Sequence, residues 1–252
     1  MPYTQDYELA LLRGIEEPRP WDLAAEVLRH VDKSDRVLDV GCGTCTKLKT
    51  IAPHAQIVFG LDPNPEMLKR ASENIQQWGV SNLHLVRAKA DRLPFPDGSL
   101  NIVTSMVAVH DTQEVARVLG PNGIAVVEKL GDRDKWNLKL AFGSDEYGPR
   151  GFLSELPEGA RIDLLRRDFG EHFADVKIVT GKWKTYFSLE GFTRLCEQVS
   201  LIRDFDRVRD SHILTRIERE FMTPQGIETS QQRILIIARG VKTSKAIAVQ
   251  VA

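Results

Sequence analysis

The chain of 252 residues has little cysteine, no excess of charge of either sign and no long apolar segment. Its three cysteines are too few for a secreted disulfide framework, which favours a reducing compartment. The 34 Lys and Arg against 35 Asp and Glu give a net charge of −1, which disfavours a nucleic-acid partner. The longest apolar runs, such as residues 234–238, are strand-sized and far too short to span a bilayer.

What is present is the composition of a globular protein. Hydrophobic residues make up 42% of the chain and charged residues 27%, which argues against disorder. The length predicts one domain with additions and a core that needs neither disulfides nor a structural metal. Residues 1–6 lack the basic and apolar regions of a signal peptide, so we expect a cytoplasmic protein without a membrane partner.

Strand and helix patterns alternate along the first half of the chain. Short apolar runs predict strands at 36–40, 57–61, 83–86, 100–107 and 124–128. Apolar residues at helical spacing predict helices at 21–31, 65–78 and 114–119, with Asn64 and Gly79 bounding the second and a turn at 120–123. This alternation is typical of a parallel sheet covered by helices on both faces.

The second half has a less regular pattern. We expect helices and loops over 132–172, a strand at 174–179, helices at 189–199 and 213–221, and a last strand at 233–238. Residues 187–226 are interpreted as an insertion between the last two strands. Residues 241–252 are interpreted as a tail.

A glycine-rich turn follows the first predicted strand, where residues 37–44 read Val-Leu-Asp-Val-Gly-Cys-Gly-Thr. Glycines directly after a buried strand allow a tight turn and close approach of the backbone to a ligand. Asp39 lies at the carboxyl end of this strand, and Asp62 lies 19 residues after Gly43, at the end of the next strand. That spacing is typical of a carboxylate that binds ribose hydroxyls, in a nucleoside without a 2′-phosphate.

At these residues the chain resembles the class I S-adenosylmethionine-dependent methyltransferases, and especially their small-molecule branch. Residues 93–100, 105–110 and 117–123 resemble further segments of that family, in the same order, within residues 36–130. The resemblance implies an α/β, Rossmann-like fold with a mostly parallel seven-stranded sheet and an antiparallel last strand. It also implies an N-terminal helical segment, 1–35, that caps the cofactor site. The methyltransferase domain would span 36–240, with substrate-side insertions at about 132–172 and 187–226.

The resemblance further implies S-adenosyl-L-methionine as the cofactor. The backbone of Gly41, Cys42 and Gly43 would line its methionine part, with Asp39 near the amino group. Asp62 would hold the ribose, and its neighbour Pro63 would belong to the same site.

On the adenine side, the resemblance implies a contact from the backbone N–H of Ala90, with Asp91 close to it. Ser105 would lie near the sulfonium. Two positions depart from the family pattern. Cys45 stands where a third glycine is common, and Lys89 stands where an acidic residue often accepts from the adenine amino group. Lys89 has no acceptor atom, so Asp91 is the candidate for that contact.

Catalysis of methyl transfer to oxygen or nitrogen needs a group that takes a proton. His110 follows the fourth predicted strand and has an ordinary pKa near neutrality, so it is the candidate base. Asp111 is the candidate to orient it. A histidine that merely begins the next helix explains the same position.

Acceptor selection is expected in the half after residue 131. The candidate pocket residues are aromatic, although aromatic residues in such segments are more often part of the core: Trp136, Tyr147, Trp183, Tyr186, Phe187 and Phe192. The triplet Lys182-Trp183-Lys184 combines charge with a stacking surface and keeps an RNA methyltransferase open as an alternative. A protein methyltransferase is a further alternative, and the favoured partner is a small organic acceptor.

Two other interpretations explain less of the sequence. Cys42 and Cys45 form a Cys-x-x-Cys pair, typical of redox or zinc sites, but further metal ligands are scarce. A nicotinamide-dependent oxidoreductase needs glycine or alanine at position 46, where the chain has Thr46. A cofactor-binding protein without catalytic activity is the remaining alternative outside the enzymes.

Overall fold

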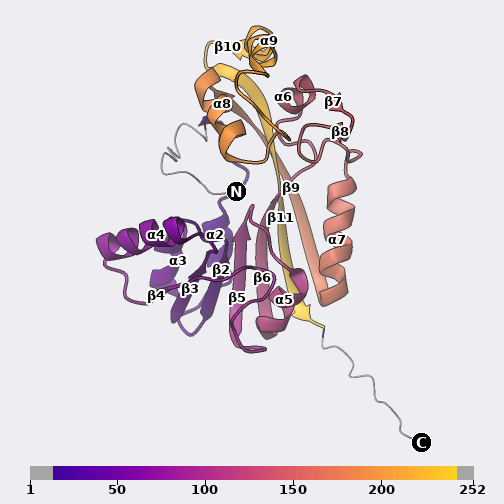
Figure 1. The fold of residues 1–252 in the computed structure, drawn as a ribbon. Helices are drawn as coiled ribbons and strands as arrows, with labels where there is room; N and C mark the ends of the chain where they lie inside the picture. Colours follow the sequence, from indigo (N-terminus) through magenta and orange to yellow (C-terminus); the bar gives the residue numbers. More distant parts are fainter. Residues whose placement is uncertain (1–13, 243–252) are drawn as a thin grey trace, which may run out of the picture. The chain divides into compact units, whose positions relative to one another are not determined.

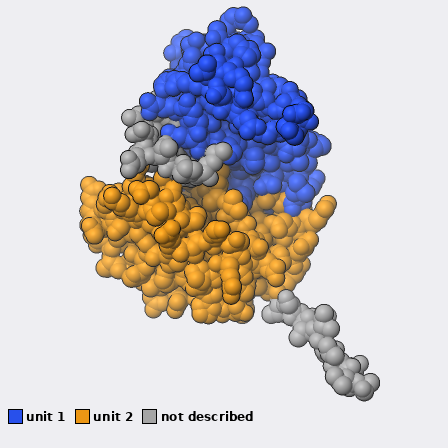
Figure 2. Space-filling view, in the orientation of Figure 1, with its two compact units in different colours: residues 1–22, 128–164, 178–235 blue, residues 23–127, 165–177, 236–252 orange. Residues whose placement is uncertain are grey.

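The computed structural model describes residues 14–242. Its largest element is a nine-stranded sheet in the order β1-β9-β11-β6-β5-β2-β3-β4, with β10 paired to β11. The chain forms two compact units (Figure 2). Unit 1 comprises residues 1–22, 128–164 and 178–235, and unit 2 comprises 23–127, 165–177 and 236–252.

Unit 2 contains the predicted alternation of strands and helices (Figure 1). Its complete strands are β2 (Arg36–Val40), β3 (Ile57–Leu61), β4 (Leu83–Val86) and β5 (Leu100–Met106). Strand β2 lies between β3 and β5 and pairs with both in parallel, and β3 pairs in parallel with β4. Val37, Leu38 and Val40 are fully buried, as expected for a parallel strand with both faces covered.

The helices of unit 2 include one that begins and ends at residues that favour those positions. They are α2 (Leu23–Leu28), α3 (Leu48–Ile51) with the short 3₁₀ helix η1 (Ala52–His54), α4 (Pro65–Trp78) and α5 (Thr112–Val118). Asn64 caps α4 by accepting a hydrogen bond from the backbone N–H of Glu66. Gly79 ends α4 with a left-handed φ of 66°. The predicted bounds of α4 are confirmed.

Unit 1 contains a short strand near the start of the described chain and the elements inserted after residue 131. They are α6 (Trp136–Ala141), the hairpin of β7 (Ser144–Asp145) and β8 (Gly148–Pro149), α8 (Leu189–Gln198), α9 (Ser211–Phe221) and the short strands β1 (Ile15–Glu16) and β10 (Met222–Thr223). Its core includes Leu138, Phe187, Phe192 and Ile217, contributed by α6, β9, α8 and α9. The expected helical insertion before the last strand is confirmed.

Four elements contribute residues to both units: β6 (Leu119–Leu130), α7 (Ala160–His172), β9 (Phe173–Phe187) and β11 (Gly226–Val241). Two of the nine strands, β1 and β10, are only two residues long. The other seven correspond to the seven predicted strands, which confirms the Rossmann-like fold class.

Three strands are longer than the apolar runs predicted. The prediction of a turn at 120–123 is wrong, because β6 already begins at Leu119. Pro121 is exposed near the start of this strand, where a missing N–H is tolerated. Strands β9 and β11 have 15 and 16 residues, because buried and exposed positions alternate beyond their apolar runs.

Two sequence-based expectations fall partly on residues that are not described. Residues 1–13 of the expected N-terminal segment, and residues 243–252 of the expected tail, lie outside the described range. Within residues 14–242, no helix is both long enough and apolar enough to cross a membrane.

A buried charged network joins the start of α6 to β11 within unit 1. Asp134 forms ion pairs with Lys135, at 3.1 Å, and with Arg233, and it accepts the backbone N–H of Gln232 at 3.0 Å. Burial raises the pKa of Asp134, but Lys135, Arg233 and this N–H outweigh it, so the pKa lies at about 2.

We expect Phe192→Ala to lower the free energy of unfolding by about 3–5 kcal/mol, because it removes a fully buried ring from the core of unit 1. Leu164→Ala is the control: this side chain is 43% exposed, so we expect a change of about 0.5 kcal/mol or less. Urea denaturation measures both. A loss below about 1 kcal/mol for Phe192→Ala contradicts this packing.

The lowered pKa of Asp134 makes the stability dependent on pH. Its contribution is present above the unfolded pKa, near 3.8, and is lost as the pH falls through about 2. We therefore expect the wild type to lose about 2 kcal/mol more than Asp134→Asn between pH 5 and pH 2. Asp175→Asn, at an exposed carboxylate, is the control. Equal losses in the wild type and Asp134→Asn contradict the prediction.

Candidate functional site

The loop after β2 depends on glycine at two positions. Gly41 and Gly43 have φ values of 73° and 54°, in the left-handed region that favours glycine. A Cβ atom on Gly41 would lie 2.3 Å from the Cβ of Ala108, so no side chain fits there. A Cβ on Gly43 would meet no described atom within 4 Å, so the backbone borders open space at that point. This is the arrangement that lets a loop approach a ligand closely.

Asp62 joins this loop to the start of α4. Its Oδ2 accepts the backbone N–H of Gly43 at 3.0 Å, and its Oδ1 accepts that of Asn64 at 2.8 Å. Each carboxylate oxygen can accept a second hydrogen bond, so Asp62 keeps capacity for ribose hydroxyls. Pro63 follows it as an exposed residue.

Asp39 is a buried carboxylate at the end of β2, and one of its two oxygens has no hydrogen-bond partner among the described residues. Its side chain has no exposed surface, and its Oδ2 accepts a hydrogen bond from Lys47 Nζ at 2.6 Å. Its Oδ1 has no hydrogen-bond partner among the described residues. Burial raises the pKa of Asp39 and Lys47 opposes that effect, with the balance above the ordinary value. A buried unpartnered oxygen beside an open loop is what a cationic ligand group would satisfy.

Lys47 is the residue that the sequence interpretation missed. It lies eight positions after Asp39, and no motif in the sequence singles it out. The folded loop brings its ammonium group to the buried carboxylate. The two left-handed glycines and Asp62 were predicted, and they show where the chain turns. The direction of the Lys47 side chain does not follow from the spacing of residues in the sequence.

The two loop cysteines pack over β3. A Cβ atom on Gly60 would lie 2.8 Å from the sulfur of Cys45 and 3.0 Å from that of Cys42, so the sulfurs fill the space above this glycine. A hydrogen bond with Cys45, together with burial, raises the pKa of the Cys42 thiol. Such a thiol is a poor nucleophile, because the thiolate is the reactive form. Cys45 adopts a left-handed φ of 64°, the conformation that a third glycine would take.

The adenine-side candidates follow β4. Ala90 is half-buried in the turn after this strand, and Asp91 is exposed. The segment beyond them is held by Glu114, which accepts the backbone N–H of Leu93 at 2.8 Å, and by Arg117, which donates to the carbonyls of Leu93 and Phe95. The roles of Ala90 and Asp91 stay predictions.

The catalytic candidates lie at and beyond the end of β5. Ser105 is 1% exposed, and its hydroxyl has no hydrogen-bond partner among the described residues. His110 lies edge-on to Phe169, with ring centres 5.7 Å apart. Asp111 caps α5 by accepting the N–H of Glu114 at 2.9 Å. This cap explains Asp111 by itself, and the catalytic roles of His110 and Asp111 stay predictions.

The aromatic residues proposed for acceptor selection divide into two groups. Four of them are core residues at most 7% exposed: Trp183, Tyr186, Phe187 and Phe192. Trp136 is half-buried beneath the guanidinium of Arg133, 4.0 Å from its ring centre. Tyr147 is 75% exposed. The stacking role suggested for Trp183 is therefore wrong, because its ring is buried.

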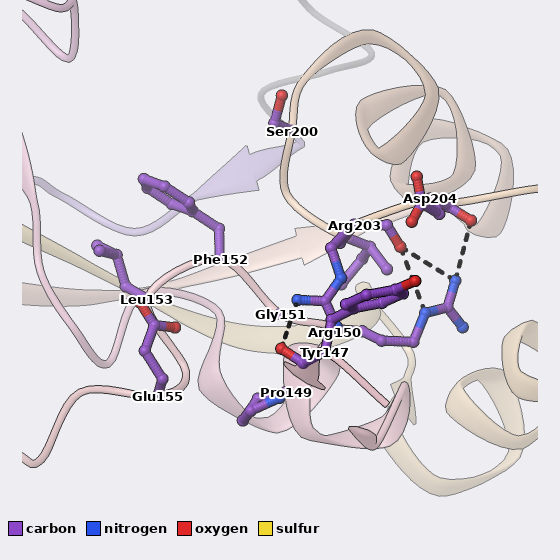
Figure 3. A pocket seen from close by; sticks show the side chains of 11 residues that line it. Tyr147, Pro149, Arg150, Gly151, Phe152, Leu153, Glu155, Ser200, Arg203 and Asp204 are labelled. Atoms are coloured by element: carbon purple, nitrogen blue, oxygen red, sulfur yellow. Dashed lines mark hydrogen bonds between the residues drawn. The ribbon is translucent and has the colours of Figure 1, made fainter. Parts of the chain in front are cut away.

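Tyr147 and Phe152 line a cavity of about 390 Å³ that lies wholly in unit 1 (Figure 3). Arg150 donates to both oxygens of Asp210 at 2.9 Å, and Arg203 pairs with Asp145. The charges of these two lining arginines are thus already balanced by carboxylates. The volume suits a small organic molecule.

Among the residues that the structure describes, no group of three or more His, Cys, Asp or Glu side chains is arranged to hold a metal ion. The groups near the glycine loop instead suit a nucleoside that carries a charged amino acid. They comprise the Asp62 carboxylate, the Gly43 backbone beside open space, and the buried Asp39 oxygen, which has no partner among the described residues.

Comparisons with known proteins match the part of the chain that holds this site. A family model described as "Methyltransferase domain" matches residues 37–123. The uncharacterized methyltransferase YcgJ of Bacillus subtilis is 38% identical over 95 residues, which cover 35% of this chain and 38% of that protein. The demethylmenaquinone methyltransferase of Geobacillus kaustophilus is 32% identical over 108 residues, which cover 38% of this chain and 46% of that protein. The match thus spans less than half the length of either relative.

Solved structures extend the likeness of fold to most of the chain. The crystal structure of YcgJ from Bacillus subtilis has a TM-score of 0.62 and 22% identity, and covers 88% of this chain and 98% of that one. A putative methyltransferase from Bacillus halodurans has a TM-score of 0.62 and 18% identity, and covers 88% and 99%. Residues 37–123 therefore match a methyltransferase domain, in a chain that shares the fold of YcgJ and of the Bacillus halodurans protein.

Proposed function

We propose that this protein transfers a methyl group from S-adenosylmethionine to a small organic acceptor. The observation that carries the proposal is the meeting of three features at the ends of β2 and β3. These are the left-handed glycine loop, the Asp62 carboxylate bonded to that loop, and the buried Asp39 oxygen without a partner among the described residues. Each of them suits a different part of the same cofactor.

The cofactor-binding residues act by position. The loop of Gly41, Cys42 and Gly43 would line the methionine part, and Asp39 would accept from its ammonium group. Asp62 would accept from the ribose hydroxyls. The Ala90 N–H and Asp91 would contact the adenine, and the Ser105 hydroxyl would lie on the sulfonium side.

When bound, the cofactor supplies a methyl group on a positively charged sulfur, ready for in-line attack. The work of the protein is then to hold the acceptor atom in line, which by itself supplies a large part of such catalysis. His110 would accept the proton of an oxygen or nitrogen acceptor.

A small acceptor is favoured over RNA by the charges and rings of unit 1. Its cavity has the volume of a small-molecule site, and the two arginines in its lining are paired with carboxylates. Trp183 is buried and Lys184 pairs with Glu228 at 2.9 Å, so the Lys182-Trp183-Lys184 triplet offers no stacking platform. The name of the demethylmenaquinone methyltransferases among the relatives points the same way.

Calorimetric titration tests the cofactor site. We expect S-adenosylmethionine and S-adenosylhomocysteine to bind the wild type, and Asp62→Ala to weaken both by about tenfold or more, since hydrogen bonds to a charged group are lost. Asp97→Ala, at a carboxylate with an 81% exposed side chain, is the control and should bind as the wild type does. The absence of binding at millimolar ligand, or unchanged binding by Asp62→Ala, contradicts the proposal.

The acceptor class is tested with a methyl-labelled cofactor. We expect label to enter the small-molecule fraction of a cell extract. The two arginines of the cavity are already paired with carboxylates, so they are not free to bind the phosphates of RNA. Fractionation into small molecules, RNA and protein after incubation measures the transfer, and enzyme with S-adenosylhomocysteine in excess is the control. Label that appears in RNA or protein alone contradicts a small acceptor.

A further inference from the structure

We propose that Lys47 is the residue that binds the α-carboxylate of the cofactor, and that it works as a pair with Asp39. The inference rests on the proposed function, since it assigns a residue to the methionine end of that site. The pair would recognise a zwitterionic amino acid, with Asp39 taking the ammonium group and Lys47 taking the carboxylate.

The positions of both side chains support this assignment. The Lys47 side chain is 13% exposed and that of Asp39 is fully buried, so their ion pair is largely withdrawn from water. Lys47 Nζ makes one hydrogen bond within the described residues, to Asp39 Oδ2 at 2.6 Å. An ammonium group has three N–H donors, so donors remain for a second acceptor.

Asp39, the other member of the ion pair, also has unused hydrogen-bonding capacity. Asp39 Oδ1 has no hydrogen-bond partner among the described residues although it is buried. A pair formed only to neutralise a buried charge leaves this oxygen at a cost in free energy. One unpartnered acceptor and spare donors on an adjacent ammonium group match the donor and acceptor ends of an amino acid.

A neighbouring lysine provides a contrast: Lys47 directly precedes α3, and Lys49 lies within that helix. Lys49 is exposed and lies over the ring of Trp78, with its Nζ 5.4 Å from the ring centre. Lys47 and Lys49 therefore share sequence context and charge but differ in environment. Only the first lies beside the glycine loop's buried carboxylate.

The consequence is discrimination by the amino-acid end of the ligand. A hydrogen bond to a buried charged group contributes more binding free energy than one to an exposed group. A buried charged group that is left without a partner costs free energy. The wild type should therefore prefer ligands that carry both the ammonium group and the carboxylate. Ligands without the carboxylate should gain nothing from Lys47.

Three probes separate these contributions in calorimetric titrations. S-adenosylhomocysteine carries both charged groups, its decarboxylated analogue carries only the ammonium group, and 5′-methylthioadenosine carries neither. We expect the wild type to bind S-adenosylhomocysteine about 10- to 100-fold more tightly than the decarboxylated analogue. In Lys47→Met this preference should fall to about threefold or less, with binding of methylthioadenosine unchanged. Lys47→Arg should keep the preference, and Lys49→Met should match the wild type.

The outcomes distinguish the two proposals. If the wild type binds neither S-adenosylhomocysteine nor methylthioadenosine, the proposed function fails and this inference fails with it. If the wild type binds them but shows no preference for the carboxylate, or if Lys47→Met weakens all three probes equally, the cofactor site stands and the role of Lys47 is overturned. Thermal melts check that each variant is folded, and Lys47→Gln replaces Lys47→Met if the latter unfolds.

Discussion

The hydrogen bonds of one carboxylate determine the shape of the candidate site. Asp62 holds the N–H of Gly43 with one oxygen and that of Asn64 with the other, so the loop after β2 and the beginning of α4 are fixed relative to each other. The same loop is tied to β3 by the N–H groups of Gly41 and Cys42, which both donate to the carbonyl of Leu61. Because β2 and β3 are parallel and in register from Arg36 and Ile57, their carboxyl ends arrive together. The open space beside Gly43 exists because these bonds and the left-handed glycines hold the backbone there.

Charge within unit 2 is arranged around the same loop. Asp39 and Lys47 form a withdrawn ion pair, and a buried pair of this kind is weak support for stability, because removing two charges from water is costly. Binding of a ligand would explain why this ion pair is present, whereas its contribution to stability does not. The loop cysteines have the simpler role of packing over Gly60, where their sulfurs replace the volume that a side chain would need. The two cysteines of the Cys-x-x-Cys pair therefore have a packing role in this loop.

The elements that sequence predicted well are those fixed by local chemistry. Strands β2, β3 and β4 have their predicted bounds because each is a short apolar run that ends at a turn, and α4 does because Asn64, Pro65 and Gly79 favour its ends. The lengths of β9 and β11 were missed because their outer residues are polar and alternate, so apolar runs mark only part of each strand. Four predicted pocket aromatics proved to be core, since burial of Phe187 or Phe192 depends on which distant helices pack against it. Lys47 was missed for a related reason: its partner Asp39 is on a strand, and only the folded loop brings the two together.

We propose that the ends of β2 and β3 hold an adenosyl amino acid. A crystal structure of the chain with S-adenosylhomocysteine tests it most directly. The account predicts ribose hydroxyls about 3 Å from the Asp62 carboxylate and the ligand's ammonium group about 3 Å from Asp39 Oδ1. A ligand bound away from the Gly41–Gly43 loop, or one whose ribose and ammonium group contact other residues, would contradict it.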